Sequence, residues 1–244
     1  MAGHSKWSNI KHKKKKQDKK KAKLFGKLVK EITVEARKNP DPEENPTLAS
    51  AIERAKDANM PKENIERAIK RATGELEDVE YKIQLYEGYG PGSTAVLIKA
   101  ITDNRNRTST KLKNIFEKYG GELGEDGCVK WMFTRKGVVT LEDRELGNPD
   151  ADTLQLEAID RGAEAIDHTN GKVKLYCQPD DLEPITEYLE ECSLDFTAKL
   201  VMLPQSEKEP DEETRPKVEE FLEELRDYED VEEIYTNIAN STAD

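Results

Sequence analysis

The chain has 244 residues, of which 35% are hydrophobic and 37% are charged, and its formal net charge is −12. This length allows one large domain or two to three small ones, and the low hydrophobic content favours several small ones. No apolar run approaches the ~20 residues of a membrane span, and the N-terminus lacks the apolar core of a signal peptide, so we expect a cytoplasmic protein without a membrane partner.

Positive charge is concentrated in residues 1–23, which hold ten lysines and two of the three histidines around a single tryptophan. Residues 1–38 carry 14 Lys and Arg against three acidic residues, a local charge of +11, which leaves −23 for the other 206 residues. So many lysines cannot all find carboxylates nearby, and we therefore expect an extended, mobile arm that binds a polyanion. The alternative is a solvated tail, or one that docks on the acidic remainder of the chain.

Lysine contacts to phosphate release counterions and make binding strongly salt-dependent, whereas aromatic rings can stack on bases or pack against a duplex edge. The arm residues that we predict to bind nucleic acid are Lys6, Trp7, Lys11, His12, Lys13, Lys14, Lys15, Lys16, Lys19 and Lys20.

The pattern after the arm predicts a three-helix domain over residues 24–78. Apolar residues from Phe25 to Ala36 recur at intervals of three and four, which is typical of an amphipathic helix. Asn45 and Pro46 form a helix-start signal for the second helix. The third helix begins at Pro61 and ends at Gly74.

From residue 79 the hydrophobic period changes to two, which predicts strands. A hairpin is expected around the glycine-rich turn 88–92, followed by a helix from about Thr108 and a strand over 128–134. The turn is not a phosphate-binding loop, because no Gly-Lys-Ser/Thr follows it.

Residues 137–203 predict the order β-α-β-β-α-β, which is the ferredoxin-like arrangement, with a hairpin turn at Asn170-Gly171. A helix over 214–225 and a strand over 231–238 follow, and alone they would have no core. We therefore expect 79–136 and 204–244 to form one discontinuous domain, with 137–203 inserted in it. The predicted class is α+β: an N-terminal three-helix domain followed by two ferredoxin-like α/β sandwich domains, one inserted in the other.

A second basic group lies at Arg105 and Arg107, close to Lys111 and Lys113 at the predicted start of a helix. Guanidinium groups near a helix N-terminus suit phosphate oxygens, so we include Arg105 and Arg107 among the candidate nucleic-acid ligands. The alternative is that the two arginines are only solvated, as arginines in a loop usually are.

The sequence contains no recognisable enzyme site, because no Ser, Cys or Asp has an assignable base partner and His168 stands alone. The three cysteines are odd in number and widely spaced, which favours reduced thiols over disulfides or zinc ligands. We therefore expect no catalysis, no cofactor, no metal and no small-molecule substrate.

Four motifs, in order along the chain, closely resemble the YebC/PmpR family. They are Gly3-His4-Ser5-Lys6-Trp7 with Ile10-Lys11-His12-Lys13, the segment 59–69, the segments 86–92 and 102–108, and Trp131-Met132-Phe133 with Arg135-Lys136-Gly137. Ser93 and Cys128 depart from the usual Gly and Ser. The resemblance implies a helical N-terminal domain and two ferredoxin-like domains.

The family resemblance also implies a role in gene expression. Bacterial members are described as cytoplasmic DNA-binding transcriptional regulators, whereas mitochondrial relatives are described as translational activators. Our first hypothesis is a DNA-binding transcriptional regulator that uses the lysine-rich arm. The alternatives are a translation factor that binds ribosomal RNA on the ribosome, and an acidic protein-interaction module whose tail docks on itself.

Overall fold

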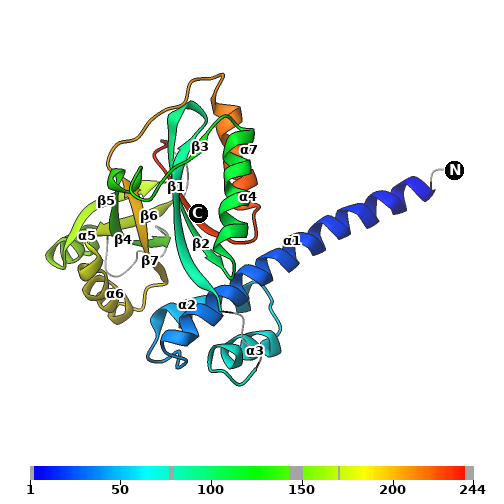
Figure 1. Cartoon of the computed structure of the whole chain (residues 1–244). Coiled ribbons are helices and arrows are strands. Elements are labelled where there is room, and N and C mark those ends of the chain that lie inside the picture. The colour runs from blue at the N-terminus through cyan, green and yellow to red at the C-terminus, as the bar shows by residue number, and fades with distance from the viewer. Residues whose placement is uncertain (1–2, 77–79, 143–150, 170, 240–244) are drawn as a thin grey trace. The chain divides into compact units, whose positions relative to one another are not determined.

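The computed structural model describes residues 3–76, 80–142, 151–169 and 171–239, and within the first helix it describes side chains from residue 21 onward. The helices are α1 (Gly3–Lys38), α2 (Pro46–Asp57), α3 (Lys62–Ala72), α4 (Arg105–Lys118), α5 (Ala151–Asp160), α6 (Leu182–Glu191) and α7 (Arg215–Arg226) (Figure 1). The strands are β1 (Lys82–Gly90), β2 (Thr94–Thr102), β3 (Glu122–Leu123), β4 (Phe133–Glu142), β5 (Ala163–Thr169), β6 (Lys172–Cys177), β7 (Phe196–Pro204) and β8 (Val231–Thr236). The predicted α+β class is confirmed: a helical N-terminal region precedes two four-stranded sheets.

Helix α1 runs without interruption for 36 residues, so the prediction of an extended arm is wrong for the backbone from Gly3 onward. Lysine has a high intrinsic helix propensity, and residues 4–25 contain neither glycine nor proline. Helices propagate more easily than they nucleate. The lysine-rich turns therefore continue a helix whose later turns are packed on α2 and α3.

The second half of α1 packs on α2 and α3 through one apolar face. Ile32, Leu48 and Ile65 represent the three helices in a shared buried core. The predicted start of α2 is confirmed, because the Asn45 side chain accepts a hydrogen bond from the backbone N–H of Leu48 at 3.1 Å and Pro46 follows it. The Asn45 amide also donates to two backbone carbonyls at the end of α1.

The first sheet has the strand order β3-β1-β2-β8. Strands β1 and β2 form the predicted antiparallel hairpin, with Gly90 opposite Thr94, and the turn is confined to Pro91–Ser93. Strand β8 comes from the C-terminal part of the chain and lies beside β2, where the backbone N–H of Ile101 donates to the carbonyl of Asp230 at 2.8 Å. The sheet is thus completed by a segment distant in sequence.

The predicted strand over 128–134 is wrong. The third strand of the first sheet is the short β3, which pairs with β1 directly after α4. Gly121 allows the chain to pair with β1 so soon after α4. A Cβ at this position would lie 2.5 Å from the carbonyl oxygen of Tyr89, so only glycine permits the two backbones to approach this closely. Lys130–Met132 instead form a short 3-10 helix, and β4 begins at Phe133.

Helices α4 and α7 lie side by side in Figure 1 and share an aromatic contact. The rings of Phe116 and Phe221 meet edge to face with their centroids 5.0 Å apart. The ring centroid of Tyr119 lies 5.7 Å from that of Phe221. Gly90 of β1 leaves room for Phe221, since a Cβ there would lie 2.6 Å from its ring. The C-terminal helix is therefore packed against the same unit as β1.

The second sheet has the order β5-β6-β4-β7 and the predicted β-α-β-β-α-β connection. Leu154 of α5 and Ile185 of α6 are fully buried against Val139 and Leu175 of the sheet. Gly171 has the positive φ expected at the hairpin turn, whereas Asn170 lies outside the described residues.

The chain divides into two compact units, one of residues up to 128 with 210–234, and one of residues 129–209 with the segment that begins at Tyr235. The helical region and the first sheet, with β8 up to Ile234, belong to the first unit. The finer division into domains 24–78, 79–136 plus 204–244, and 137–203 stays a prediction.

Candidate nucleic-acid interface

Helix α1 presents two different faces in the part whose side chains are described. Its apolar residues pack on α2 and α3, whereas Lys23, Lys27 and Lys30 recur at intervals of four and three and therefore share another face. These three lysines contact the end of α7 and the turn that follows it. The basic helix is thus attached to the folded unit on two sides.

The three lysines find acceptors of two kinds at the end of α7. Lys23 forms an ion pair with Asp227 at 3.0 Å, and Lys27 donates to the backbone carbonyl of Arg226 at 3.0 Å. Lys30 donates to the carbonyl of Glu229 at 3.2 Å and to the carboxylate of Asp230 at 2.5 Å. Cations suit this position, because a helix C-terminus carries unpaired carbonyls and partial negative charge.

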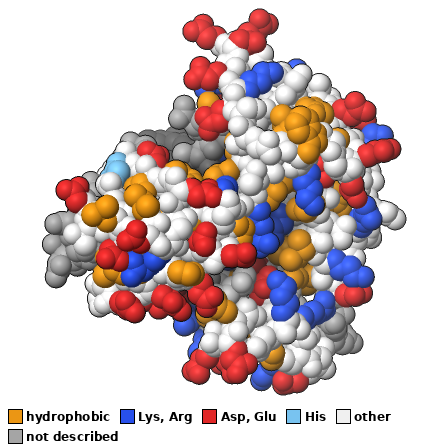
Figure 2. Space-filling view, turned by 90° about the vertical axis from the view of Figure 1, so that its left-hand side faces the viewer, with side chains coloured by type: hydrophobic (Ala, Val, Ile, Leu, Met, Phe, Trp, Pro, Cys, Tyr) orange, Lys and Arg blue, Asp and Glu red, His pale blue; other side chains and the backbone are white. Residues whose placement is uncertain are grey.

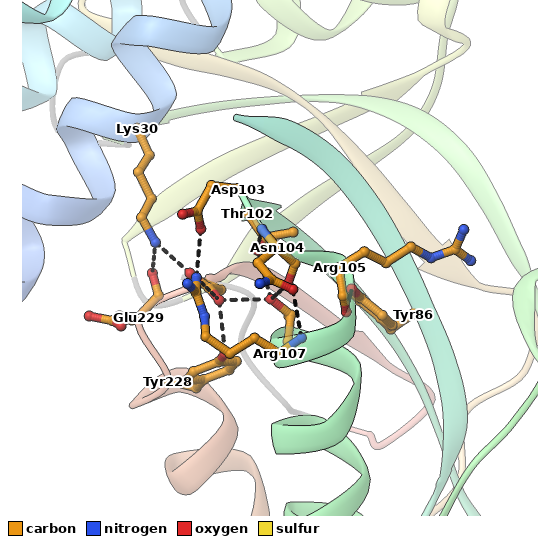
Figure 3. Close-up of polar contacts among 11 residues, drawn as sticks. Lys30, Tyr86, Thr102, Asp103, Asn104, Arg105, Arg107, Tyr228 and Glu229 are labelled. Atoms are coloured by element: carbon orange, nitrogen blue, oxygen red, sulfur yellow. Dashed lines mark hydrogen bonds and ion pairs between the residues drawn. The ribbon is translucent and has the colours of Figure 1, made fainter. Parts of the chain in front are cut away.

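Asp230 is the centre of this attachment. Its side chain is 0% exposed, and its carboxylate accepts hydrogen bonds from Thr108 at 2.8 Å, Tyr228 at 2.8 Å and Arg107 at 3.2 Å in addition to Lys30. Figure 3 shows Lys30 from α1 and Arg107 from α4 reaching toward the same place. One buried carboxylate therefore joins α1, α4 and the start of β8.

The charge on Asp230 is stabilised by these donors. Burial alone would raise the pKa of Asp230, but the hydrogen bonds from Lys30, Thr108 and Tyr228 outweigh burial and lower the pKa to about 2. Asp230 is therefore ionised at neutral pH, and the buried charge is compensated by Lys30 and Arg107.

A second buried carboxylate, that of Glu31, belongs to α1 itself, and only one of its oxygens is paired. Glu31 forms an ion pair with Arg54, while its Oε2 is buried and has no hydrogen-bond partner among the described residues. Burial, and next the negative charge of Glu31, raise the pKa of Glu232 on β8 to about 7. The contact between α1 and β8 thus contains one acid that is partly protonated near neutral pH.

The structure separates the two arginines that the sequence placed together. Arg107 forms ion pairs with Asp103 at 2.7 Å and with Asp230, and these two hydrogen bonds, that of Asp103 first, raise the pKa of its guanidinium. Arg105 is exposed, makes no hydrogen bond or ion pair through its side chain in the described part of the chain, and points away from the cluster in Figure 3. Arg105 is therefore the available cation at the start of α4.

Asn104 fixes the start of α4, because its side chain accepts a hydrogen bond from the backbone N–H of Arg107 at 3.0 Å. Lys111 and Lys113 lie on exposed positions further along the helix, and Lys113 pairs with Glu117 at 3.8 Å. The predicted start near Thr108 is therefore too late by three residues, since α4 begins at Arg105.

The arm residues named in the sequence analysis lie on the first half of α1, whose side chains are outside the described residues. Their backbone positions are helical. The positions of Lys6, Lys13, Lys16 and Lys20 continue the spacing of Lys23, Lys27 and Lys30, so a continuous helix places all seven positions along one side. Trp7, Lys11, His12, Lys14, Lys15 and Lys19 occupy the same helical stretch.

Sequence reasoning missed the attachment through Lys23, Lys27, Lys30 and Asp230. The regular spacing of the lysines was a usable signal. Their acceptors follow about 200 residues later, and no local pattern connects the two segments.

The described residues contain no group of three or more His, Cys, Asp or Glu side chains that could hold a metal ion. A cavity of about 390 Å³ between α2 and α3 is lined mainly by apolar side chains such as Ile52, Met60, Ile65 and Ile69. No helix among the described residues is both long and apolar enough to cross a membrane. Figure 2 shows acidic side chains spread over the face that it draws, with basic side chains between them.

The fold and the site define an α+β protein that carries a lysine-rich helix at its N-terminus. The chain matches a family model described as the TACO1/YebC protein N-terminal domain over residues 5–75, and one described as the TACO1/YebC second and third domain over residues 81–238. This chain belongs to the TACO1/YebC family, as the resemblance predicted.

Similar proteins share nearly the whole length of the chain. A probable transcriptional regulatory protein of Halothermothrix orenii is 48% identical over 97% of this chain and 94% of its own. One of Thermotoga maritima is 47% identical over 97% and 93%. The crystal structure of a conserved hypothetical protein from Aquifex aeolicus superimposes with a TM-score of 0.78 at 42% identity, over 89% of this chain and 90% of that chain.

Proposed function

We propose that this chain is a non-enzymatic, cytoplasmic regulator of gene expression that binds nucleic acid, most simply a DNA-binding transcriptional regulator. The observation that carries the proposal is the continuity of α1, whose second half is fixed to the folded unit while its first half holds the lysines. The names of the relatives, probable transcriptional regulatory proteins, support a regulatory role.

A helical arm has a consequence that a flexible arm lacks. The 18 residues from Gly3 to Lys20 form a rod of about 27 Å at 1.5 Å per residue, with lysine positions repeated along one side. B-DNA carries one phosphate charge per roughly 1.7 Å of its axis, so such a rod can contact several phosphates at once. Trp7 and His12 add an aromatic contact near the end of the rod.

Arg105 supplies the second phosphate contact in this proposal. It is exposed at the first residue of α4, where backbone N–H groups also favour anions. Arg107 contributes to the same patch by neutralising Asp103 and Asp230, whose charges would otherwise repel phosphate.

The test replaces Lys13, Lys14, Lys15 and Lys16 by alanine and measures binding to duplex DNA across a range of salt concentrations. We expect weaker binding for every sequence and a salt slope reduced by about 0.9 for each lost phosphate contact. The matched control replaces four exposed lysines outside α1, which are Lys62, Lys82, Lys172 and Lys217. Equal affinity of the arm variant and the parent chain would exclude the arm from binding.

Translation is the second candidate function, because the chain shares its family model with TACO1 and mitochondrial relatives are described as translational activators. Lysine contacts to phosphate do not distinguish DNA from RNA. Co-sedimentation with ribosomes, compared with retention on promoter DNA at the same salt concentration, separates the two. Enrichment with ribosomes alone would support the translation factor.

The docking of Lys23, Lys27 and Lys30 on the acidic end of α7 is the observation that favours a self-docked tail. A pure protein-interaction module would bind no nucleic acid. Filter binding at low salt distinguishes this case, since the proposed regulator retains DNA there and the interaction module does not.

A further inference from the structure

Trp131 is 67% exposed, which makes it the most exposed large hydrophobic side chain in the described part of the chain. Tryptophan has a large apolar surface and is usually well buried. A tryptophan held in water loses the stabilisation that burial would provide, and exposed aromatic side chains are enriched where proteins bind partners. The exposure of Trp131 therefore does not stabilise the fold, and its explanation lies in a function such as binding.

The backbone around Trp131 is firmly held, so the exposed ring is not on a loose loop. Gln205 donates its backbone N–H to the carbonyl of Met132 at 2.8 Å, and its side-chain amide to the carbonyl of Trp131 at 3.2 Å. The residues on either side of this short 3-10 helix, Val129 and Phe133, are buried. The turn is thus anchored on both sides while Trp131 itself is exposed.

Two exposed basic residues lie close to Trp131 along the chain. Lys130 precedes it in the 3-10 helix, Arg135 is the third residue of β4, and both residues are exposed. The backbone of Arg135 pairs with β7 opposite Met202, while the residue is exposed. An exposed aromatic ring with basic residues near it is a combination by which proteins bind single-stranded nucleic acid, since the ring stacks on a base and the cations hold adjoining phosphates.

We propose that Trp131 is a stacking platform for an unpaired base of single-stranded nucleic acid, with Lys130 and Arg135 on the neighbouring phosphates. The inference rests on the proposed function and refines it, because lysine contacts to phosphate alone do not separate single strands from duplexes. A base that is already paired and stacked cannot lie on the ring without leaving its helix.

The first experiment uses fluorescence. The chain has two tryptophans, so the full-length Trp7→Phe variant reports Trp131 alone. We titrate this variant with a single-stranded oligonucleotide, as DNA and as RNA, and with the duplex of the same sequence. Stacking predicts that either single strand quenches the emission with saturation, whereas bound duplex leaves the emission unchanged.

The second experiment measures affinity by anisotropy of a labelled oligonucleotide. We expect Trp131→Ala to weaken single-strand binding about tenfold without changing duplex binding, and Trp131→Phe to retain most of the affinity. Arg135→Ala should reduce the salt slope by about one phosphate contact. The matched control is Leu156→Ala on α5, which removes a side chain that is 66% exposed and should change neither affinity.

The outcomes separate this inference from the proposed function. The platform would be overturned if Trp131→Ala bound single strands with unchanged affinity and if single strands did not quench the emission of the Trp7→Phe variant. In that case the arm would remain a binding element, and Trp131 would be assigned to contact with a protein partner. An equal loss for Leu156→Ala would also overturn the platform. Absence of binding to both single strand and duplex by the parent chain would overturn the proposed function as well.

Discussion

The ammonium of Lys30 lies 2.5 Å from the carboxylate of Asp230, although 200 residues separate the two in sequence. The Asp230 side chain is 0% exposed and that of Lys30 is 14% exposed, so water contributes little to their solvation. Removing one partner from a buried ion pair leaves an uncompensated charge. This contact therefore couples the attachment of the basic helix to the stability of the first sheet.

Replacing Asp230 by asparagine should lower the free energy of unfolding by about 3 kcal/mol, because Lys30 and Arg107 both lose a buried counter-charge. Urea denaturation measures the change. The control is Glu66→Gln, which removes the exposed pair with Lys62 at 3.5 Å and should cost less than about 1 kcal/mol. Similar losses for the two variants would contradict the role assigned to Asp230.

The low pKa of Asp230 predicts an acid-dependent loss of stability. Its folded pKa of about 2 lies below the usual 3.8, so the stabilisation is present above about pH 4 and is lost as the pH falls toward 2. The shift corresponds to about 2 kcal/mol. Urea midpoints measured between pH 2 and 5 should therefore converge for the parent chain and Asp230→Asn at the acid end, and a constant difference would refute the assignment.

Glu232 predicts the opposite dependence on pH. Its folded pKa of about 7 lies above the usual 4.5, so its protonated form stabilises the fold below pH 4.5, and that stabilisation is lost as the pH rises through 7. We expect Glu232→Gln to be more stable than the parent at pH 8 and equally stable at pH 4.5. Thermal unfolding at both pH values measures this, with the exposed Glu229→Gln as the control that shows no such difference.

The continuity of α1 can be tested without changing its charge. Proline at Ala22 removes a helical hydrogen bond and collides with the preceding turn, at a cost of about 3 kcal/mol, so the lysine rod should detach from the packed half of the helix. We expect reduced helical circular dichroism and weaker DNA binding, with Ala22→Gln as the helix-preserving control. Unchanged affinity of the proline variant would show that the lysines act as a flexible polycation.

Two glycines should respond in opposite ways to alanine. Gly26 lies within α1 and a Cβ there meets nothing within 4 Å, so Gly26→Ala should stabilise the chain by up to about 1 kcal/mol. At Gly121 a Cβ would lie 2.5 Å from the carbonyl oxygen of Tyr89 and 2.9 Å from the Cα of Gly90, so Gly121→Ala should destabilise it. Chemical denaturation of both variants measures the signs, and a neutral Gly121→Ala would contradict the close approach of β3 to β1.

The sequence by itself determined the elements whose signals are local. The apolar spacing from Phe25 to Ala36, the Asn45 cap and the period of the later strands predicted helices and strands close to their observed bounds. Such signals act within a few residues, because hydrogen bonds and side-chain spacing define each element. The motifs at the N-terminus and around Trp131 likewise sufficed to indicate the family.

Only the tertiary structure decided the rest. Residues 128–134 have the composition of a strand, but the close approach that Gly88 and Gly121 permit places β3 beside β1 instead. In the sequence Arg107 has the features of a free phosphate ligand, but in the fold it forms an ion pair with Asp230 from the C-terminal part of the chain. Trp131 has the side chain of a typical core residue, but in the fold it is exposed. Burial and ion pairing depend on which distant segments meet, and a linear pattern does not contain that information.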